Sequence, residues 1–236
     1  MVTKLKKLSI IIPCYNELLS LETLLNKCLK IITDEIEIIL VDNGSVDGSF
    51  EYLLKCNLPK NIVPVRIEKN LGYGNGILTG LNHSKGDIVC WTHADLQTDL
   101  SDVIKGYNLY KNDLINKICL VKGERKNRNI VDTFFTFSMG IYSSIILKTW
   151  LFDINAQPKI FHRSFLDKFN NPPLDFSLDL FLLYFFKSNR LKVKSFPVFF
   201  NNRKFGEAKG GGSFKGKLKL IKRTFLYIHK LRAEIQ

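Results

Sequence analysis

Short apolar runs that each end in a polar turn constrain the fold of this chain more than any other feature. Residues 8–12, 37–41 and 88–92 read LSIII, EIILV and IVCWT, and the next residue is Pro, Asp or His. Runs of this length that are rich in β-branched residues are typical of buried strands. Apolar residues at helical spacing over Glu22–Ile32 predict a helix between the first two runs. Strands that alternate with helices predict an α/β fold with a mostly parallel, doubly wound sheet.

Further segments extend this alternation along the chain. Ser20 is the expected N-cap of the first helix, and Asp47–Lys55 forms the next predicted helix. Residues 62–67 predict a third strand, and the glycines from Gly72 to Gly80 open another helix. Much later, Lys192–Phe200 predicts an edge strand.

Polar side chains follow three of the predicted strands. Tyr15, Asp42 and Asp95 each come just after a strand, where doubly wound sheets bind their ligands. Around Asp95, the turn also offers His93 and Gln97 at alternate positions, so that imidazole, carboxylate and amide oxygen could ligate a divalent ion. Such an ion would neutralise the diphosphate of a nucleotide-activated substrate. The alternatives are a surface aspartate beside a core histidine, and an Asx-turn at Asp42.

The glycine-rich stretch Asn70–Gly76 resembles a phosphate cradle. A dinucleotide fingerprint would need a third glycine where Ile77 stands, and it would follow the first strand of the sheet. A Rossmann oxidoreductase is therefore a weak competitor, and a flexible loop or a helix entry is the alternative.

Charge and cysteine content restrict the partners. The net charge of +13 favours anionic partners, namely nucleotide or lipid phosphates, an anionic membrane, or nucleic acid. Asp42 and Asp95 argue against nucleic acid, because carboxylates repel phosphates unless a metal intervenes. The five cysteines form no CxxC pair, which supports neither a zinc site nor a disulfide framework and favours reduced thiols in the cytosol.

Two segments are suited to a membrane surface. Residues 133–152 are about as long as a bilayer span, but hydroxyl side chains and Lys148 favour a helix in the membrane interface or in the protein interior. From Lys217 onward an apolar stripe lies among basic side chains, which predicts a basic amphipathic helix. A basic patch at Lys122, Arg125, Lys126 and Arg128 precedes the first segment.

Four motifs occur in order at the ends of the predicted strands: P-x-Y-N-E (13–17), V-D-N-G-S (41–45), N-x-G (70–72) and x-A-D-L-Q (93–97). Together they resemble the family-two inverting glycosyltransferases of GT-A fold, and most closely the dolichyl- and polyprenyl-phosphate sugar transferases. Residues 122–125 resemble the G-x-R element of that family and residues 153–163 its acceptor loop. Residues 203–209 resemble its R-x-x-G-x-S-K motif, with Ala208 in place of the serine.

The resemblance covers about residues 8–210 and implies a Rossmann-like GT-A domain at 1–210, followed by an amphipathic helix at 211–236. The donor half would span about 8–100 and the acceptor half about 120–210. It implies a nucleotide-sugar donor held by Pro13, Tyr15, Glu17, Asp42, Asn70 and Gly72. Asp95 and Gln97 would hold the diphosphate and a divalent metal. The family usually has Asp where this chain has His93, which suits Mn²⁺ better than Mg²⁺, so the identity of the metal stays open.

The resemblance also implies the catalytic residues. Arg203 and Lys209 would help the metal to stabilise the leaving diphosphate. A hydroxyl acceptor needs a base, and Asp179 matches the acidic position of the wider family, although it could equally be a carboxylate that stabilises the start of a helix. A phosphate acceptor needs no base, and Arg125 and Arg128 could bind it, unless they belong to a solvated basic patch.

We therefore expect an inverting hexosyltransferase that acts on a polyprenyl-phosphate-type lipid at the cytoplasmic face of a membrane. The expected attachment is peripheral, through the two membrane-suited segments, a membrane protein partner or a homo-oligomer. The alternatives are transfer to a sugar hydroxyl of a surface glycan and non-catalytic binding of an anionic membrane.

Overall fold

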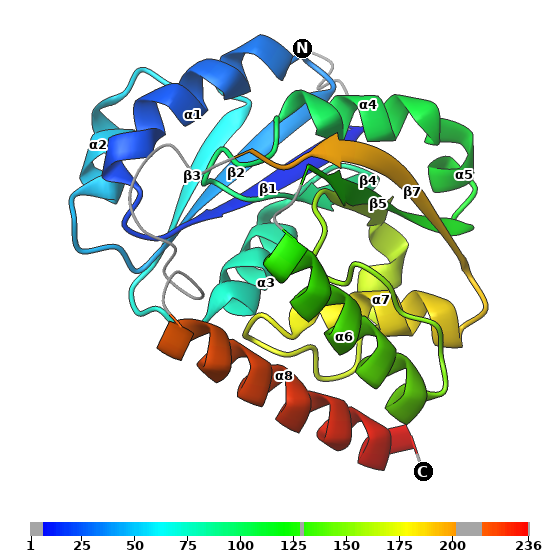
Figure 1. Ribbon diagram of the computed structural model, residues 1–236. Helices are drawn as coiled ribbons and strands as arrows, with labels where there is room; N and C mark the ends of the chain where they lie inside the picture. Colours follow the sequence, from blue (N-terminus) through cyan, green and yellow to red (C-terminus); the bar gives the residue numbers. More distant parts are fainter. Residues whose placement is uncertain (1–6, 128–129, 202–213, 236) are drawn as a thin grey trace.

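Within residues 7–127, 130–201 and 214–235, which the computed structural model describes, a seven-stranded mixed sheet carries helices on both faces (Figure 1). The strand order is β3-β2-β1-β4-β6-β5-β7. The strands are β1 (Leu8–Cys14), β2 (Ile36–Asn43), β3 (Ile62–Ile67), β4 (Ile88–Trp91), β5 (Cys119–Lys126), β6 (Lys159–His162) and β7 (Lys192–Phe199). The helices are α1 (Leu18–Ile31), α2 (Ser49–Lys55), α3 (Tyr73–His83), α4 (Ser101–Leu109), α5 (Lys111–Ile115), α6 (Ile130–Leu147), the short 3₁₀ helix η1 (Arg163–Lys168), α7 (Leu178–Ser188) and α8 (Phe214–Ile235).

The alternation of side chains along β1 builds two separate cores. Ile10 and Ile12 face a cluster that includes α1, α4 and α5, whereas Ile11 faces a cluster that includes α3, α7 and α8. All three isoleucines are completely buried. Because both faces of the strand are covered, the run is apolar except for the buried Ser9, as in other buried parallel strands.

Strand direction divides the sheet into two parts. β3, β2, β1 and β4 are mutually parallel, and β5 is parallel to β7. β6 runs antiparallel to both β4 and β5 and joins the two parts. The predicted α/β fold with a mostly parallel sheet is confirmed, and the predicted edge strand is β7. The carboxyl ends of β1, β2 and β4 lie at one edge of the sheet, where a ligand is expected.

The start of the first helix differs from the prediction. α1 begins at Leu18 with Glu17 in the N-cap position, so Ser20 is not the N-cap. Ser20 is buried within the first turn, and its hydroxyl donates to the Glu17 carbonyl at 3.0 Å. The apolar pattern from Glu22 onward marks the buried face of the helix. The helix itself begins four residues before that pattern, at Leu18.

α6 and α8 pack together on the sheet face that also carries α3 and α7 (Figure 1). The ring of Tyr142 stacks on Phe225 with centroids 4.9 Å apart, and its hydroxyl lies 2.6 Å from Nε2 of His229. Ile228 anchors α8 in the core. Across the described residues, no helix is both long and apolar enough to cross a membrane.

Candidate active site

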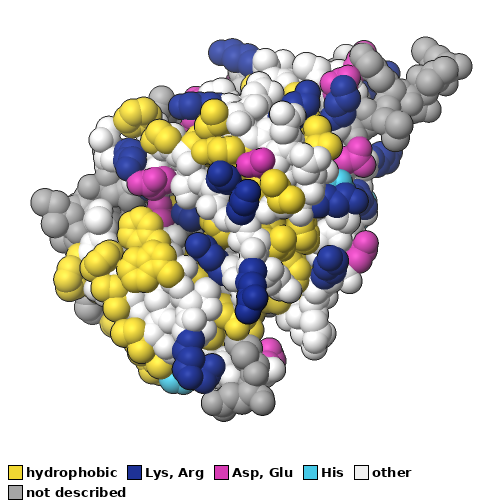
Figure 2. Space-filling model, turned by 90° about the vertical axis from the view of Figure 1, so that its right-hand side faces the viewer, with side chains coloured by type: hydrophobic (Ala, Val, Ile, Leu, Met, Phe, Trp, Pro, Cys, Tyr) yellow, Lys and Arg dark blue, Asp and Glu magenta, His cyan; other side chains and the backbone are white. Residues whose placement is uncertain are grey.

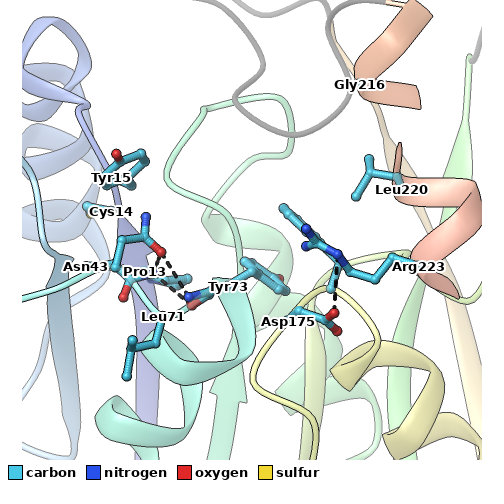
Figure 3. Close-up of a pocket in the computed structure, with 13 residues that line it drawn as sticks. Pro13, Cys14, Tyr15, Asn43, Leu71, Tyr73, Asp175, Gly216, Leu220 and Arg223 are labelled. Carbon is cyan, nitrogen blue, oxygen red and sulfur yellow. Dashed lines mark hydrogen bonds and ion pairs between the residues drawn. The ribbon is translucent and has the colours of Figure 1, made fainter. Parts of the chain in front are cut away.

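A cavity of about 660 Å³ opens at the carboxyl ends of β1 and β2 (Figure 3). Four of the residues predicted to bind a nucleotide line it, namely Pro13, Tyr15, Asn70 and Gly72. The opposite wall comes from the loop before α7 and from α8, through Asp175, Phe176, Leu220 and Arg223. The sequence did not indicate this second wall, because its residues begin at Asp175, 78 positions after the last strand-end motif.

The turn at Asn70 is fixed by hydrogen bonds and by close packing. Oδ1 of Asn70 accepts from the Gly72 backbone N–H at 2.9 Å, and Nδ2 of Asn43 donates to the Gly72 carbonyl at 2.9 Å. Gly72 has φ of +128°, and a Cβ there would lie 2.4 Å from the Leu174 carbonyl oxygen. Only glycine fits this position. Asn43, which the sequence reasoning missed, lies within the V-D-N-G-S motif and lines the cavity.

Asp42 and Glu17 adjoin this cavity without lining it. Asp42 is completely buried, and its Oδ2 accepts from the Ser45 backbone N–H at 3.3 Å, as in the Asx-turn alternative. Among the described residues its Oδ1 has no hydrogen-bond partner. Oε2 of Glu17 accepts from the Ser20 hydroxyl at 3.0 Å. A buried carboxylate oxygen without a partner is costly unless a ligand or water donates to it.

The turn after β4 contains the three predicted metal ligands His93, Asp95 and Gln97. Oδ1 of Asp95 accepts from the Gln97 backbone N–H at 3.1 Å, and Leu96 between them has φ of +60°. Nε2 of Gln97 donates to the Asn201 carbonyl at 3.2 Å, which leaves the amide Oε1 as its acceptor. His93 is half-buried. Within the described part of the chain, no group of three His, Cys, Asp or Glu side chains could hold a metal. One carboxylate, one imidazole and one amide oxygen fit a divalent ion that shares its coordination with substrate phosphates.

Tyr73 connects the cavity to this turn. Its ring stacks on Phe176 with centroids 4.7 Å apart and meets the His93 ring at 5.6 Å. Its hydroxyl accepts from Nε2 of Gln157 at 3.2 Å. Burial, reinforced by the negative charges of Asp179 and Asp95, raises the pKa of Tyr73 well above its ordinary value. The phenol therefore stays neutral. Its ring forms part of the cavity wall, and the hydrogen bond from Gln157 fixes its hydroxyl.

Asp179 lies in the first turn of α7 and is enclosed. Its side chain accepts from Nε1 of Trp91 at 3.1 Å and from Nε2 of Gln157 at 2.9 Å. Nζ of Lys159, which is completely buried, lies 3.8 Å from Oδ1 of Asp179 and donates to the Ile154 carbonyl. Burial lowers the pKa of Lys159 although Asp179 opposes this shift. Asp179 thus has a buried counter-ion that neither sequence interpretation contained.

A second cavity, of about 620 Å³, lies between β5 and α6. Phe134, Phe137 and Phe152 line it together with Arg125 and Asp153. Nε of Arg125 donates to Oδ1 of Asp153 at 2.8 Å, and its Nη2 donates to the same oxygen. Burial by itself raises the pKa of Asp153, but the charge and hydrogen bonds of Arg125 outweigh it and hold that pKa below its ordinary value. The cavity combines a fixed guanidinium with an aromatic wall.

The prediction that Lys122 belongs to a basic surface patch is wrong. Lys122 is buried in β5, and its Nζ donates to the carbonyls of Gly123 and Asp153, both at 3.1 Å. Burial, together with the neighbouring charge of Lys159, lowers the pKa of Lys122 to about 7. Three further predicted site residues, Arg128, Arg203 and Lys209, lie outside the described residues.

A parallel half with a polar cavity at its strand ends, joined through an antiparallel strand to a second half, is the GT-A architecture of nucleotide-sugar glycosyltransferases. The chain belongs to glycosyl transferase family 2, because the model of that family matches residues 9–169.

Curated relatives match a part of the chain. An undecaprenyl-phosphate 4-deoxy-4-formamido-L-arabinose transferase from Photorhabdus laumondii is 39% identical over 105 residues, which are 42% of this chain and 32% of that protein. The protein of the same name from Yersinia enterocolitica is 40% identical over 105 residues with the same coverage. The chain thus spans about a third of the length of these curated relatives.

Solved structures share the fold at low sequence identity. Glucosyl-3-phosphoglycerate synthase from Mycobacterium tuberculosis, in complex with Mn²⁺, UDP and glucosyl-3-phosphoglycerate, has a TM-score of 0.65 and 17% identity over 96% of this chain and 80% of that one. Staphylococcus aureus TarS (residues 1–349), in complex with UDP-GlcNAc, has a TM-score of 0.59 and 19% identity over 85% of this chain and 60% of that one. These likenesses support the GT-A fold.

Proposed function

We propose that the protein is an inverting hexosyltransferase that moves a sugar from a nucleotide-sugar donor to a polyprenyl-phosphate-type lipid. The main observation in favour of a lipid-phosphate acceptor is the second cavity, where the Arg125 guanidinium lies beside three phenylalanines. A lipid phosphate has the matching chemistry, with an anionic head for the guanidinium and an apolar chain for the aromatic wall. The names of the curated relatives agree with this acceptor.

The donor is assigned to the cavity at the ends of β1 and β2. Its residues would be those that the sequence motifs predicted, namely Pro13, Tyr15, Glu17, Asp42, Asn70 and Gly72. Oδ1 of Asp42, which has no hydrogen-bond partner among the described residues, is an acceptor suited to an N–H of the base, and Tyr15 offers a ring on which a base can stack. The structures with UDP or UDP-GlcNAc bound make a uridine donor the first to test.

A divalent metal would be held by Asp95, with Gln97 and His93 as further ligands. When bound, it would supply positive charge to the leaving diphosphate. The chain's own residues orient this site: Leu96 holds the turn, and the Asn201 carbonyl fixes the amide of Gln97. Arg203 and Lys209 remain predicted diphosphate ligands from outside the described residues.

On the acceptor side, a phosphate nucleophile is already ionised and requires no base. Arg125 would exchange part of its ion pair with Asp153 for the phosphate oxygens. Arg128 stays a predicted second ligand. The alternative acceptor, a sugar hydroxyl, would require Asp179 as the base, and Asp179 is only 1% exposed and bound by Trp91 and Gln157. This enclosure favours the phosphate acceptor.

An anionic membrane surface is the proposed location, at the cytoplasmic face and through peripheral contact. Phe134, Phe135 and Phe137 of α6 are exposed, as are Leu226 and Phe225 of α8. Figure 2 shows hydrophobic side chains gathered at the lower left of one face, with Lys and Arg side chains nearby. Exposed aromatic and basic side chains together are typical of interfacial helices. A membrane protein partner or a second copy of the chain would be an additional means of attachment.

The decisive experiment compares acceptors. The full chain is incubated with radiolabelled UDP- or GDP-hexoses, Mn²⁺ or Mg²⁺, and either a short-chain polyprenyl phosphate or a free oligosaccharide. We expect label on the lipid phosphate only, and a loss of this transfer in Arg125→Gln. The exposed Arg66→Gln, which removes a surface ion pair with Glu51, is the matched control. Label on the oligosaccharide alone would contradict the lipid acceptor and restore Asp179 as the base.

A further inference from the structure

α8 contributes a cation to the donor cavity from outside the family match. Gly216, Leu220 and Arg223 line the cavity and are spaced by four and three residues, so they lie along one face of the helix. The family model ends at residue 169, and the sequence motifs end at 209. In Figure 3, Arg223 points from α8 into the cavity, opposite Tyr15 and Asn43, with Tyr73 between the two walls.

Arg223 is the only cationic side chain among the described residues that line this cavity, and Asp175 is the only anionic one. The two form an ion pair, with Nε of Arg223 3.4 Å from Oδ2 of Asp175. The pair is partly open to solvent, since 38% of the arginine side chain and 29% of the aspartate side chain are exposed. A solvated pair of this length contributes little to stability.

The ion pair with Asp175 is formed through Nε of Arg223. A guanidinium has five N–H donors, and phosphate oxygens bind it through two parallel hydrogen bonds. A nucleotide whose base occupies the Tyr15 side of the cavity would extend its phosphates toward the Tyr73 wall and the α8 side. Apart from the ion pair of Arg223 and Asp175, the described lining residues are neutral, so Arg223 is the cation that they offer to an incoming diphosphate.

We propose that Arg223 binds the diphosphate of the nucleotide-sugar donor and that Asp175 holds the arginine in place before the donor arrives. The inference rests on the proposed function, which places the donor in this cavity. It adds a ligand that the strand-end motifs do not contain, and it gives α8 a role in donor binding besides its exposed apolar face. The donor diphosphate would then contact the turn of Asp95 and Gln97 in the first half of the chain and Arg223 near its C-terminal end.

The test is a titration calorimetry series on the full chain with UDP and GDP in the presence of Mn²⁺, with uridine and guanosine as phosphate-free probes in a thermal-shift assay. In Arg223→Gln we expect about tenfold weaker binding of the nucleoside diphosphate, the loss typical of a charged hydrogen bond, and an unchanged shift with the nucleoside. The affinity of Arg223→Lys for the nucleoside diphosphate should lie between those of the wild type and Arg223→Gln, because lysine keeps the positive charge but cannot form two parallel hydrogen bonds. Lys222→Gln, one residue earlier on the exposed face, is the matched control and should bind like the wild type.

Asp175→Asn separates a ligand role from an architectural one. If Asp175 positions the arginine, Asp175→Asn should weaken diphosphate binding, but by less than Arg223→Gln does, because the guanidinium charge remains. Unchanged affinity would overturn this positioning role of Asp175. Weakening equal to that of Arg223→Gln would overturn the inference, as would wild-type affinity in Arg223→Gln. In either case the wild type would still bind nucleoside diphosphates, and the proposed function would stand. A wild type that binds no nucleoside diphosphate would instead refute the proposed function and this inference together. The unliganded melting temperature of each variant shows that it folds.

Discussion

Replacing Asp179 by asparagine should unbalance a buried charge while it preserves most of the local hydrogen bonds. The amide oxygen can still accept from Trp91 and Gln157, but Lys159 loses the negative charge 3.8 Å from its Nζ. At that separation, with an effective dielectric constant of about 20, the lost attraction is about 4 kcal/mol.

The cost has an upper bound because a buried lysine can release its proton. Discharging a lysine at pH 7 from its ordinary pKa of 10.5 costs about 1.4 kcal/mol per pH unit, or about 5 kcal/mol in all. Asp179→Asn should therefore lower the free energy of unfolding by about 3–5 kcal/mol. The sign of the pH dependence follows. Because the pKa of Lys159 falls further in the folded variant, the unfolded chain binds more protons, and stability should rise with pH between about 7 and 9.

Urea unfolding at pH 7 and pH 9 measures both effects. The double variant Lys159→Met/Asp179→Asn removes both charges and leaves mainly the Ile154 carbonyl without its donor, a loss of about 1–3 kcal/mol. It should be more stable than Asp179→Asn alone, and the cycle should show a coupling of at least about 2 kcal/mol. Additive effects of the two single substitutions, or no pH dependence in Asp179→Asn, would refute the buried ion pair.

Three other expectations follow from the described contacts. Lys122→Met should reduce the rise of stability with pH above about 7 by at most about 1.4 kcal/mol per pH unit, because the lowered pKa of Lys122 makes the unfolded wild-type chain bind an extra proton. Urea unfolding of the wild type and the variant from pH 7 to 9 measures this difference. Gly123→Ala should destabilise the protein by about 3 kcal/mol or more, because the new Cβ would lie 2.1 Å from the Gln157 carbonyl oxygen; a shift in thermal midpoint reports it. His93→Asp should raise the apparent affinity for Mg²⁺ relative to Mn²⁺ by about tenfold in a metal titration with UDP present, because it adds a hard anionic ligand; an unchanged metal preference would place the ion elsewhere.

The sheet could be predicted wherever strands are buried on both faces. β1 and β4 and the centre of β2, residues 38–41, are almost entirely apolar, so their sequences alone indicate a core position. β5 ends in the charged stretch Lys122–Lys126, which has the composition of an exposed patch. Its ladder with β7 and its contact with Asp153 bury Lys122 and Gly123 of that stretch, and both partners lie far along the chain. A single sequence without tertiary context contains no signal for such burial.

The donor cavity likewise contains some residues that the sequence predicted and others that it could not. Pro13, Tyr15, Asn70 and Gly72 belong to motifs at strand ends, and the fold brings strand ends together. Phe176 and Arg223 belong to a loop and a helix whose composition indicates only solvent exposure or membrane contact. Arg223 reaches the cavity because α8 packs against α6 and joins the second core through Ile228.

Asp179 shows why residue type and position did not suffice to assign a role. From the sequence, an aspartate at the start of a helix is either a base or a favourable charge at the helix N-terminus. The structure adds Lys159, 20 positions earlier, whose buried ammonium needs a counter-ion whatever the enzyme does. An enclosed, ion-paired carboxylate can take up a proton from a hydroxyl only by giving up that pairing, at a cost comparable to the few kcal/mol worked out above. A phosphate acceptor avoids that cost, and so the burial of Asp179 and the chemistry of the Arg125 cavity favour the same acceptor on independent grounds.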